Sequence, residues 1–525
     1  MRTVAAASLT VAAGLALAGG CAAPDGSPGP GVDPADGGRL PLPPLDGGRS
    51  PGATDLGPPA EGTPDASRDE PWDGGGVRPP VDGGVQGALA LRTSWRRPSG
   101  RPLVVELTVA ADEPVNVMAR VDGPGVAGRV VPALTPGATV TLPLVALAES
   151  STYALEVEAR GLSGRTGEAR LEVTTGAIPE DVRPQPSLLP GSPADAPGLV
   201  VLGMNRGNQV VYFAVDGAGR IVWHYADRSR PGFAAPLIRP LPNGLFALFL
   251  PGEVRAVDAV GTTRWRVPVP AGEAFHHDFQ VLPSGNVLAL SEEVRMISVP
   301  GEGDVPTLGD VIVEIDRAGT VVERWAALDH LDGTRYPGPL ARTMVRGGTV
   351  RDWSHGNAIT YRASDSSVLL SLRHQHWIVR VAWPSGMVDW ILGDDGDFDL
   401  ESPGLWFSAQ HAPAWARNGR LLVYDNGNER GDTAEPYTRV VEYRLDPDLG
   451  EAEETWSWRA PHYTAFVGDV DELSGTYLVT AGTTPALGGG AIYEVDRAGT
   501  VRWSLAVRGG SIYRSERVPE IRMVP

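Results

Sequence analysis

The residues best suited to chemistry are histidines that share a position within a repeated unit. None of the nine histidines precedes residue 224. His277 and His411 each stand eight residues before a turn glycine, Gly285 and Gly419, and His355 opens a similar unit with a longer hairpin. A structural histidine of the repeat should recur in every unit, whereas other units have Pro or Val at this offset. We therefore interpret the three histidines as functional, and as lying near one another.

Two further polar residues are expected beside these histidines. Asn357 follows His355 by two positions, and Arg373 ends the second strand of the same unit, where the neighbouring units have Glu292 and Asn426. Arg offers a planar fork of donors, Asn an amide N–H, and a protonated His a charged donor, which together suit an anion with several equivalent oxygens. A neutral imidazole could then act as the nucleophile. This set favours sulfuryl or phosphoryl transfer through a histidine intermediate, with no carboxylate expected among the five residues.

A metal-dependent hydrolase is an alternative. Its ligands would come from His277, His355 and His411, with Asp278 as the nearest carboxylate. The pair His374 and His376 could also bind a metal, because alternate strand residues share a face, although the same spacing fits a structural role. The usual interpretation, a buried and hydrogen-bonded side chain, is preferred for the three remaining isolated histidines, His224, His330 and His462.

Composition excludes several function classes. The 45 basic residues are all Arg, so Schiff-base lysines and Walker-type phosphate loops are absent. Cys21 is the only cysteine, which excludes disulfides within the chain and Cys-ligated zinc. A net charge of −19 argues against nucleic acid as a partner.

The elements that must position the site are short β-strands in a repeat. A turn glycine precedes a Trp by four or six residues in six units, and both steps keep the Trp on the same face of a strand. The six glycine–tryptophan pairs are Gly219–Trp223, Gly261–Trp265, Gly319–Trp325, Gly386–Trp390, Gly450–Trp456 and Gly499–Trp503. The fold class is therefore predicted to be all-β, with a six-bladed β-propeller over residues 195–525 whose Trp residues are framework.

Three segments precede this domain. Residues 1–21 are typical of a lipoprotein signal peptide in which Cys21 is lipidated, which predicts an exported protein, periplasmic or at the cell surface and anchored to a membrane. Residues 22–86 are rich in Pro, Gly and Asp and are expected to be a disordered linker. Residues 87–178 alternate polar and apolar positions, which predicts a fibronectin type III or Ig-like β-sandwich with Tyr153 as its corner tyrosine.

Eight short motifs, in the same order, resemble the bacterial arylsulfotransferase family. They cover most of the predicted propeller and are HHDFQVLPSGN at His276, DWSHGNAITY at Asp352, LLSLRHQHWIVRV at Leu369, WILGDDGDF at Trp390, FSAQHAPAW at Phe407, LLVYDNGNERG at Leu421, RVVEYRLD at Arg439 and IYRSERVP at Ile512. The resemblance implies a propeller that moves a sulfuryl group from a phenolic sulfate ester to a phenol acceptor, by a ping-pong route through a sulfohistidine. It implies neither a nucleotide sulfate donor, nor a cofactor, nor a metal.

The same resemblance implies a role for each site residue. His411 would be the sulfated nucleophile, His277 and His355 would bind sulfuryl oxygens and move protons, and Asn357 and Arg373 would hold the negative oxygens. His276 is the alternative to His277, because adjacent strand residues should face opposite ways and only one should line the channel. No motif fixes the aromatic residues that bind the phenol, and the candidates by neighbourhood are Trp353, Tyr361, Trp406 and Phe407.

A propeller that binds such esters without turnover is the remaining alternative, since a fold does not by itself establish activity.

Overall fold

The structure is a computed structural model that describes residues 88–228, 235–338, 341–345, 347–430 and 435–523. The expected signal peptide, its Cys21 and the expected linker lie outside these residues. Nearly all of the regular structure is β-strand, as the sequence predicts, and the one α-helix among the described residues is the single turn α1 (Ala327–His330). Within these ranges, no helix has the length and apolar character that crossing a lipid bilayer would need.

The N-terminal strands form one six-stranded antiparallel arrangement around a long central strand. The strands are β1 (Arg92–Arg96), β2 (Val105–Gly123), β3 (Val126–Pro132), β4 (Gly137–Leu144), β5 (Thr152–Gly161) and β6 (Thr166–Thr174). The first half of β2 pairs with β1 and β4, and its second half, beyond a register shift, pairs with β3 and β5. Strict alternation along β5 buries every second side chain, so the period-2 pattern places one face in the core.

Tyr153 closes a loop of this N-terminal part. Its ring is fully buried, its hydroxyl donates to the carbonyl of Pro124 at 3.0 Å, and it accepts the N–H of Ala148 at 2.7 Å. The hydroxyl therefore ties two loops together by backbone hydrogen bonds, which is the role expected of a corner tyrosine.

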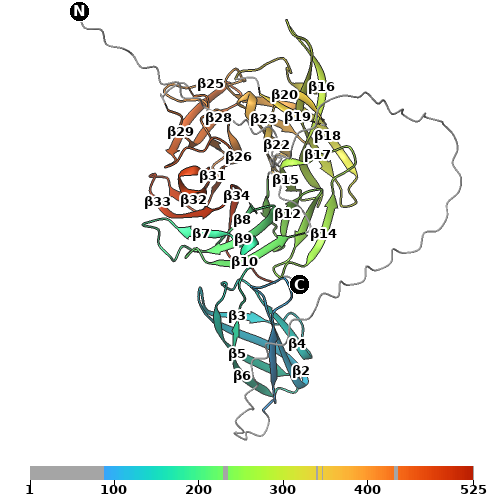
Figure 1. Cartoon of the computed structure of the whole chain (residues 1–525), viewed down its shortest axis with the longest axis vertical. Coiled ribbons are helices and arrows are strands. Elements are labelled where there is room, and N and C mark those ends of the chain that lie inside the picture. Colours follow the sequence, from blue (N-terminus) through green and yellow to red (C-terminus); the bar gives the residue numbers. More distant parts are fainter. Residues whose placement is uncertain (1–87, 229–234, 339–340, 346, 431–434, 524–525) are drawn as a thin grey trace, which may run out of the picture. The chain divides into compact units, whose positions relative to one another are not determined.

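The rest of the chain forms six successive antiparallel sheets, numbered here in chain order, which follow one another around a circle in Figure 1. Sheet 1 contains β8 (Leu199–Arg206), β9 (Gln209–Asp216), β10 (Ile221–Asp227) and β34 (Ile512–Val518). Sheet 2 contains β11 (Ile238–Pro240), β12 (Phe246–Leu250), β13 (Glu253–Val257) and β14 (Thr263–Pro268). Sheet 3 contains β15 (His276–Val281), β16 (Val287–Val299), β17 (Gly303–Ile315) and β18 (Val321–Ala326), with β20 (Gly348–Asp352) and β19 (Arg342–Val345) added beside β17.

The last three sheets repeat the same order of strands. Sheet 4 contains β21 (Gly356–Arg362), β22 (Ser367–Leu372), β23 (Trp377–Ala382) and β24 (Val388–Gly393). Sheet 5 contains β26 (His411–Trp415), β27 (Leu421–Asp425), β28 (Arg439–Asp446), β29 (Glu451–Arg459) and the short β25 (Asp399–Leu400). Sheet 6 contains β30 (Asp469–Glu472), β31 (Thr476–Thr484), β32 (Gly489–Asp496), β33 (Val501–Arg508) and, as its last strand, β7 (Gln185–Leu188). Three 3-10 turns complete the described structure: η1 (Glu180–Val182), η2 (Arg373–Gln375) and η3 (Pro485–Leu487).

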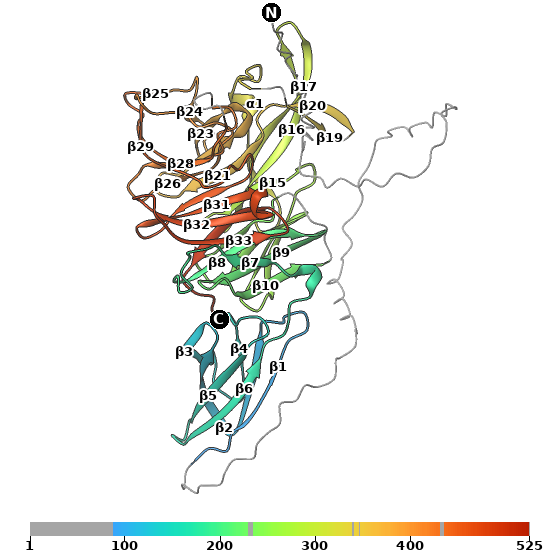
Figure 2. The same cartoon turned by 60° about the vertical axis from the view of Figure 1, so that its left-hand side comes forward.

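Two strands join sheets that are far from them in sequence. β34, near the C-terminus, pairs with β8 and becomes the first strand of sheet 1, while β7 pairs with β33 at the other edge of sheet 6. The first strands of neighbouring sheets contact one another from β15 through β21, β26 and β30 to β34, and β34 also contacts β11. The ends of the repeated part are thus interleaved: Figure 1 labels β34 next to β8, and Figure 2 labels β7 next to β33.

The hairpin turns follow from Asp and Gly at fixed positions. At Asp216, for example, the carboxylate accepts the N–H groups of Ala218 and Arg220, and Gly219 adopts the left-handed conformation, with φ of 76°, that favours glycine. The same carboxylate-to-backbone bonds recur at Asp258, Asp316 and Asp496.

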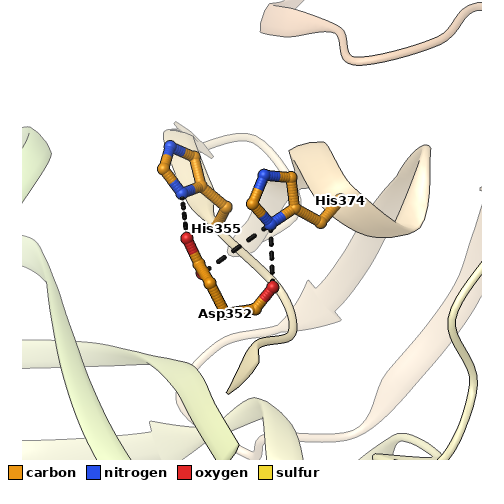
Figure 3. Close-up of side chains that lie close together, drawn as sticks. All are labelled: Asp352, His355 and His374. Carbon is orange, nitrogen blue, oxygen red and sulfur yellow. Dashed lines mark hydrogen bonds and ion pairs between the residues drawn. The ribbon is translucent and has the colours of Figure 1, made fainter. Parts of the chain in front are cut away.

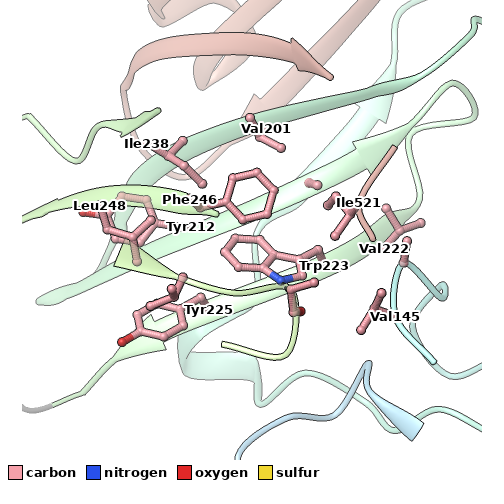
Figure 4. Packing of buried hydrophobic residues seen from close by; sticks show 14 of the residues in the cluster. Val145, Val201, Tyr212, Val222, Trp223, Tyr225, Ile238, Phe246, Leu248 and Ile521 are labelled. Atoms are coloured by element: carbon pink, nitrogen blue, oxygen red, sulfur yellow. Dashed lines mark hydrogen bonds between the residues drawn. The ribbon is translucent and has the colours of Figure 1, made fainter. Parts of the chain in front are cut away.

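The repeated Trp residues connect each sheet to the next. Trp223 in sheet 1 packs on Phe246 of sheet 2, with ring centroids 4.9 Å apart, and its indole N–H donates to the carbonyl of Ala259 at 2.8 Å (Figure 4). Equivalent bonds run from Trp325 to Gly386, from Trp456 to Arg497 and from Trp503 back to Gly217 of sheet 1. In sheet 2, Trp265 instead lies under the guanidinium of Arg317, which belongs to the turn of sheet 3. These Trp residues are framework, as the sequence predicts.

Candidate active site

His411 is the first residue of β26, and its ring is oriented by Asn426, which follows β27. The Asn426 amide nitrogen donates to the carbonyls of Thr464 and Val467, at 2.7 and 3.1 Å. The amide oxygen must therefore face His411 Nδ1, 2.7 Å away, and because that oxygen can only accept, Nδ1 carries the hydrogen. This leaves the lone pair on Nε2, which accepts the backbone N–H of Val467 at 3.2 Å.

His411 is held as a neutral imidazole. Its side chain is buried, and this burial, reinforced by the neighbouring Arg373, lowers the pKa of His411 well below its ordinary value. A neutral ring with a fixed tautomer and its lone pair on Nε2 has the form that a nucleophilic histidine requires.

Arg373 and Asn357 lie beside His411, and both keep unused hydrogen-bonding capacity. Arg373 begins η2 directly after β22 and donates from one terminal nitrogen to the carbonyl of Ala465 at 3.3 Å. Its buried Nε has no hydrogen-bond partner among the described residues. Asn357, the second residue of β21, is fully buried and donates one N–H to the carbonyl of Gln410 at 2.8 Å. Both residues can still donate to an anion at this site.

His277 and His276 do not face opposite ways, so this expectation is wrong. β15 shifts register between His276 and Phe279, and His277 adopts a left-handed conformation with φ of 53°. The two rings consequently meet edge-on, with their Nδ1 atoms 2.8 Å apart. The His277 ring lies 5.2 Å from that of His355, whereas His276 is turned toward Asp310, 3.3 Å away. His277 therefore faces the other site residues, and His276 lies behind it.

Carboxylates are present among the histidines, contrary to the expectation from sequence. Asp352 ends β20, which pairs in parallel with β17, and its carboxylate lies 2.7 Å from Nδ1 of His355 (Figure 3). His374 lies beside His355, with ring centroids 4.5 Å apart, and its Nδ1 is 2.8 Å from the Asp352 main-chain oxygen and 3.7 Å from the Asp352 carboxylate. The sequence analysis assigned no role to Asp352, although Asp352 stands three residues before His355 in the motif Asp-Trp-Ser-His.

Asp352, His355 and His374 are also the one set within the described ranges whose donor atoms lie close enough together to hold a metal ion. Both histidine nitrogens of this set, however, lie at hydrogen-bonding distance from Asp352. The geometry is that of a hydrogen-bonded histidine and carboxylate pair with a second histidine beside it. Asp278, the carboxylate of the metal alternative, instead forms ion pairs with Arg239 and Arg514 at 2.7 and 2.8 Å, so it is not available as a ligand.

Three of the remaining histidines, His224, His330 and His376, have structural partners. His374 and His376 do not share one face of a strand, because they lie in and directly after the turn η2, and His376 binds Glu429 at 2.9 Å. His224 Nε2 donates to the carbonyl of Val182 at 3.1 Å, and His330 stacks on Trp325.

The four aromatic residues suggested by neighbourhood are mostly framework. Trp353 and Phe407 are buried, Trp406 packs on Tyr443, and the backbone of Tyr361 binds Gln280. An aromatic residue that the sequence reasoning did not name lies closer. The Tyr513 ring is 6.0 Å from that of His277, and its hydroxyl donates to the carbonyl of Asn357 at 2.8 Å.

Comparison with known proteins gives the family. The profile of the family described as "Arylsulfotransferase (ASST)" matches residues 192–492, which is more than half of the chain. The chain belongs to the arylsulfotransferase family. All five polar residues described above fall within the part of the chain that matches this family.

Two curated relatives carry the name arylsulfate sulfotransferase AssT. The protein of Escherichia coli O6:H1 is 25% identical over 281 residues, and that of Lelliottia amnigena is 26% identical over 281 residues. Each match covers 42% of this chain and 46% of the relative, so the chain spans about half the length of the curated arylsulfotransferases it matches.

Solved structures show weaker similarity. A Bacteroides caccae protein of unknown function is 16% identical with a TM-score of 0.40, and the match covers 61% of this chain and 98% of that protein. The Pseudomonas aeruginosa periplasmic gluconolactonase PpgL is 12% identical with a TM-score of 0.35, and the match covers 62% of this chain and 99% of that protein.

Proposed function

We propose that this protein transfers a sulfuryl group from a phenolic sulfate ester to a phenol by a ping-pong route, with His411 as the sulfated nucleophile. The observation that carries the proposal is the fixed tautomer of His411. Asn426 keeps the hydrogen on Nδ1, so the lone pair on Nε2 is presented beside Arg373. Family membership supports the chemistry in general, and the geometry supports this residue as nucleophile.

The proposed reaction has two half-reactions. In the first, Nε2 of His411 forms a bond to sulfur while the bond from sulfur to the phenolic oxygen breaks, and Arg373, with an N–H of Asn357, stabilises the negative sulfuryl oxygens. The Val467 N–H donates to Nε2 at 3.2 Å, so this hydrogen bond must break before Nε2 can attack sulfur. The same N–H is then placed to donate to a sulfuryl oxygen. In the second, an acceptor phenol attacks sulfur and the bond to Nε2 breaks.

We also propose that the six sheets are the blades of a β-propeller and that the N-terminal strands form a fibronectin type III-like sandwich. The hydrogen bonds that pass from one sheet to the next, and return from Trp503 to Gly217, support a closed ring. The composition of residues 1–86 supports export of the protein as a lipoprotein anchored through Cys21.

The first prediction concerns His411. The full chain should release nitrophenol from 4-nitrophenyl sulfate rapidly only when phenol is added, after treatment with a chelator. His411→Ala should lower this rate by about 10³-fold or more, because it removes the nucleophile. His330→Ala is the matched control, since His330 stacks on Trp325 away from the site, and it should retain the rate.

Three other outcomes would contradict the proposal. Equal release with water alone would indicate a sulfatase, and loss of release on chelation would indicate a metal-dependent hydrolase. Binding of the ester with no release for any phenolic acceptor would indicate a binding protein.

A further inference from the structure

His277 and His355, the two histidines that face His411, have different groups next to their Nδ1 atoms. Behind His355 lies the Asp352 carboxylate, 2.7 Å from its Nδ1. Behind His277 lies another imidazole, that of His276, with the two Nδ1 atoms 2.8 Å apart. A carboxylate stabilises positive charge on the ring that it binds, whereas a neighbouring imidazole that also gains positive charge opposes it.

Asp352 is ionised under neutral conditions. Its side chain is 7% exposed, and burial alone would raise its pKa, but His355, His374 and His276 lower the pKa of Asp352 to about 2. The ionised carboxylate, 2.7 Å from Nδ1 of His355, stabilises positive charge that this ring gains when Nε2 takes up a proton.

His277 is in the opposite situation. Burial, followed by the effects of His276, His355 and His411, lowers the pKa of His277 well below its ordinary value. His277 is consequently neutral at the pH at which Asp352 is ionised. The two rings are 5.2 Å apart, so they face the same space with different groups behind them.

We propose that Asp352 is the positioning residue that makes His355, and not His277, the proton carrier between the donor phenol and the acceptor phenol. The inference rests on the proposed sulfuryl transfer, and it deepens that function by separating the roles of two histidines. Asp352 does not touch substrate in this mechanism and acts through Nδ1 of His355 alone.

His355 loses one proton in the first half-reaction and regains one in the second. In the first, His355 Nε2–H gives its proton to the phenolic oxygen as the bond from sulfur to oxygen breaks, and neutral phenol leaves. In the second, the neutral Nε2 of His355 takes the proton of the acceptor phenol as that oxygen bonds to sulfur and the bond from sulfur to His411 breaks. His355 ends protonated and His411 ends neutral, as both began. Asp352 remains ionised throughout.

Several elements bring titratable or charged groups to His355. They are His276 and His277 on β15, Glu292 on β16, Asp310 on β17, Asp352 on β20, Arg373 and His374 on η2, and His411 on β26. Burial raises the pKa of Glu292, His276 opposes this shift, and Asp310 and Asp352 reinforce it, so Glu292 is the less readily ionised of these two carboxyl groups, Glu292 and Asp352.

The second prediction tests Asp352 with two sulfate donors. In a ping-pong reaction, kcat/KM for the donor reports only the half-reaction in which the donor phenol leaves. Nitrophenolate is a weak base and leaves without a proton, whereas phenolate needs one, so general-acid catalysis matters mainly for phenyl sulfate. Asp352→Asn should lower kcat/KM by less than about tenfold for 4-nitrophenyl sulfate and by about 10²-fold or more for phenyl sulfate. Asp352→Glu keeps the charge but displaces the carboxylate. For phenyl sulfate, its kcat/KM should lie between that of the wild-type protein and that of Asp352→Asn.

A comparison is the pair His376 and Glu429, which has the same type of bond, at 2.9 Å, but does not include His355, although Glu429 also lies near Arg373 and His374. Glu429→Gln should affect both donors by the same factor. An equal loss for both donors in Asp352→Asn, or no loss for either, would overturn the inference, because Asp352 would then act only in the structure. Activity of the wild-type protein that is lost on chelation and restored by Zn²⁺ would also overturn it. Absence of turnover in the wild-type protein with either donor would instead refute the proposed function itself.

Discussion

At the residue scale, Asn426 determines which nitrogen of His411 carries the hydrogen. Its amide donates to two carbonyls of the segment that leads into β30, Thr464 and Val467. These bonds fix the direction of the amide, and through it the tautomer of the imidazole. In the proposed mechanism, a neutral amide does not take the proton from Nδ1, so sulfation would give the His411 ring a positive charge. That charge would favour departure of the sulfuryl group in the second proposed half-reaction.

The third prediction follows from this contact. Asn426→Ala should lower kcat by about 10²-fold, because His411 can then adopt the wrong tautomer. The measurement is turnover of 4-nitrophenyl sulfate at saturating phenol. Thr438→Val is the matched control, since Thr438 binds the same segment through Thr464 but does not contact His411. If both variants lose activity equally, order in the segment matters and the tautomer does not.

The sequence predicts the site residues better than it predicts their partners. The register of His277, His355 and His411 depends on regular spacing from turn glycines, which a repeat makes visible. The orientation of His276 depends on a bulge and a positive φ at His277, for which the sequence has no local signal. Asp352 stands three residues before His355 and contacts it locally, so the motif Asp-Trp-Ser-His was the available signal for this pair.

At the scale of elements, the indole hydrogen bonds hold neighbouring sheets in register. Each of four Trp residues donates to a carbonyl in the hairpin turn before the fourth strand of another sheet, and Trp503 makes the bond that joins sheet 6 to sheet 1. The side chain of Trp503 is buried, so its removal would leave the Gly217 carbonyl without this donor.

The fourth prediction is that Trp503→Phe lowers the free energy of unfolding by about 1 to 2 kcal/mol beyond the effect of the smaller ring. Thermal unfolding, followed by tryptophan fluorescence, measures the change. Trp415→Phe provides the comparison, because the Trp415 N–H has no hydrogen-bond partner among the described residues and only packing is lost there. Equal destabilisation by both substitutions would show that the hydrogen bond contributes nothing.

The elements themselves were largely predictable. The Gly–Trp spacing and the preceding Asp indicate hairpins, and the structure has a hairpin at each of these places. The exchange of β7 and β34 between the first and last sheets was not predicted, because pairing between distant strands leaves no periodicity in either segment.

At the scale of the whole molecule, burial of neutral histidines links stability to pH. Burial lowers the pKa of His224 to about 4, and an unfolded chain has an ordinary value of about 6.5. Between these two values the unfolded state binds more protons than the folded state, so this residue makes stability fall as the pH falls from about 6.5 toward 4.

The fifth prediction isolates this effect. His224→Gln keeps a donor for the Val182 carbonyl but does not titrate. The free energy of unfolding of the wild-type protein should drop, relative to that of the variant, by about 2 kcal/mol between pH 7.5 and 4.5. Chemical denaturation at both pH values tests this, and parallel curves for the two proteins would contradict it.

The exchange of β34 into sheet 1 has a consequence for the order of synthesis. The ribosome makes β8 to β10 early, but it makes the strand that completes their sheet only after the strands of the other five sheets. Tyr513 and Arg514 of β34 also contact the backbone oxygen of Asn357, so part of the support of the candidate site arrives with this strand. A growing chain therefore contains His277, His355 and His411 before their surroundings are complete. For the proposed transfer, we expect activity to begin only when β34 has docked.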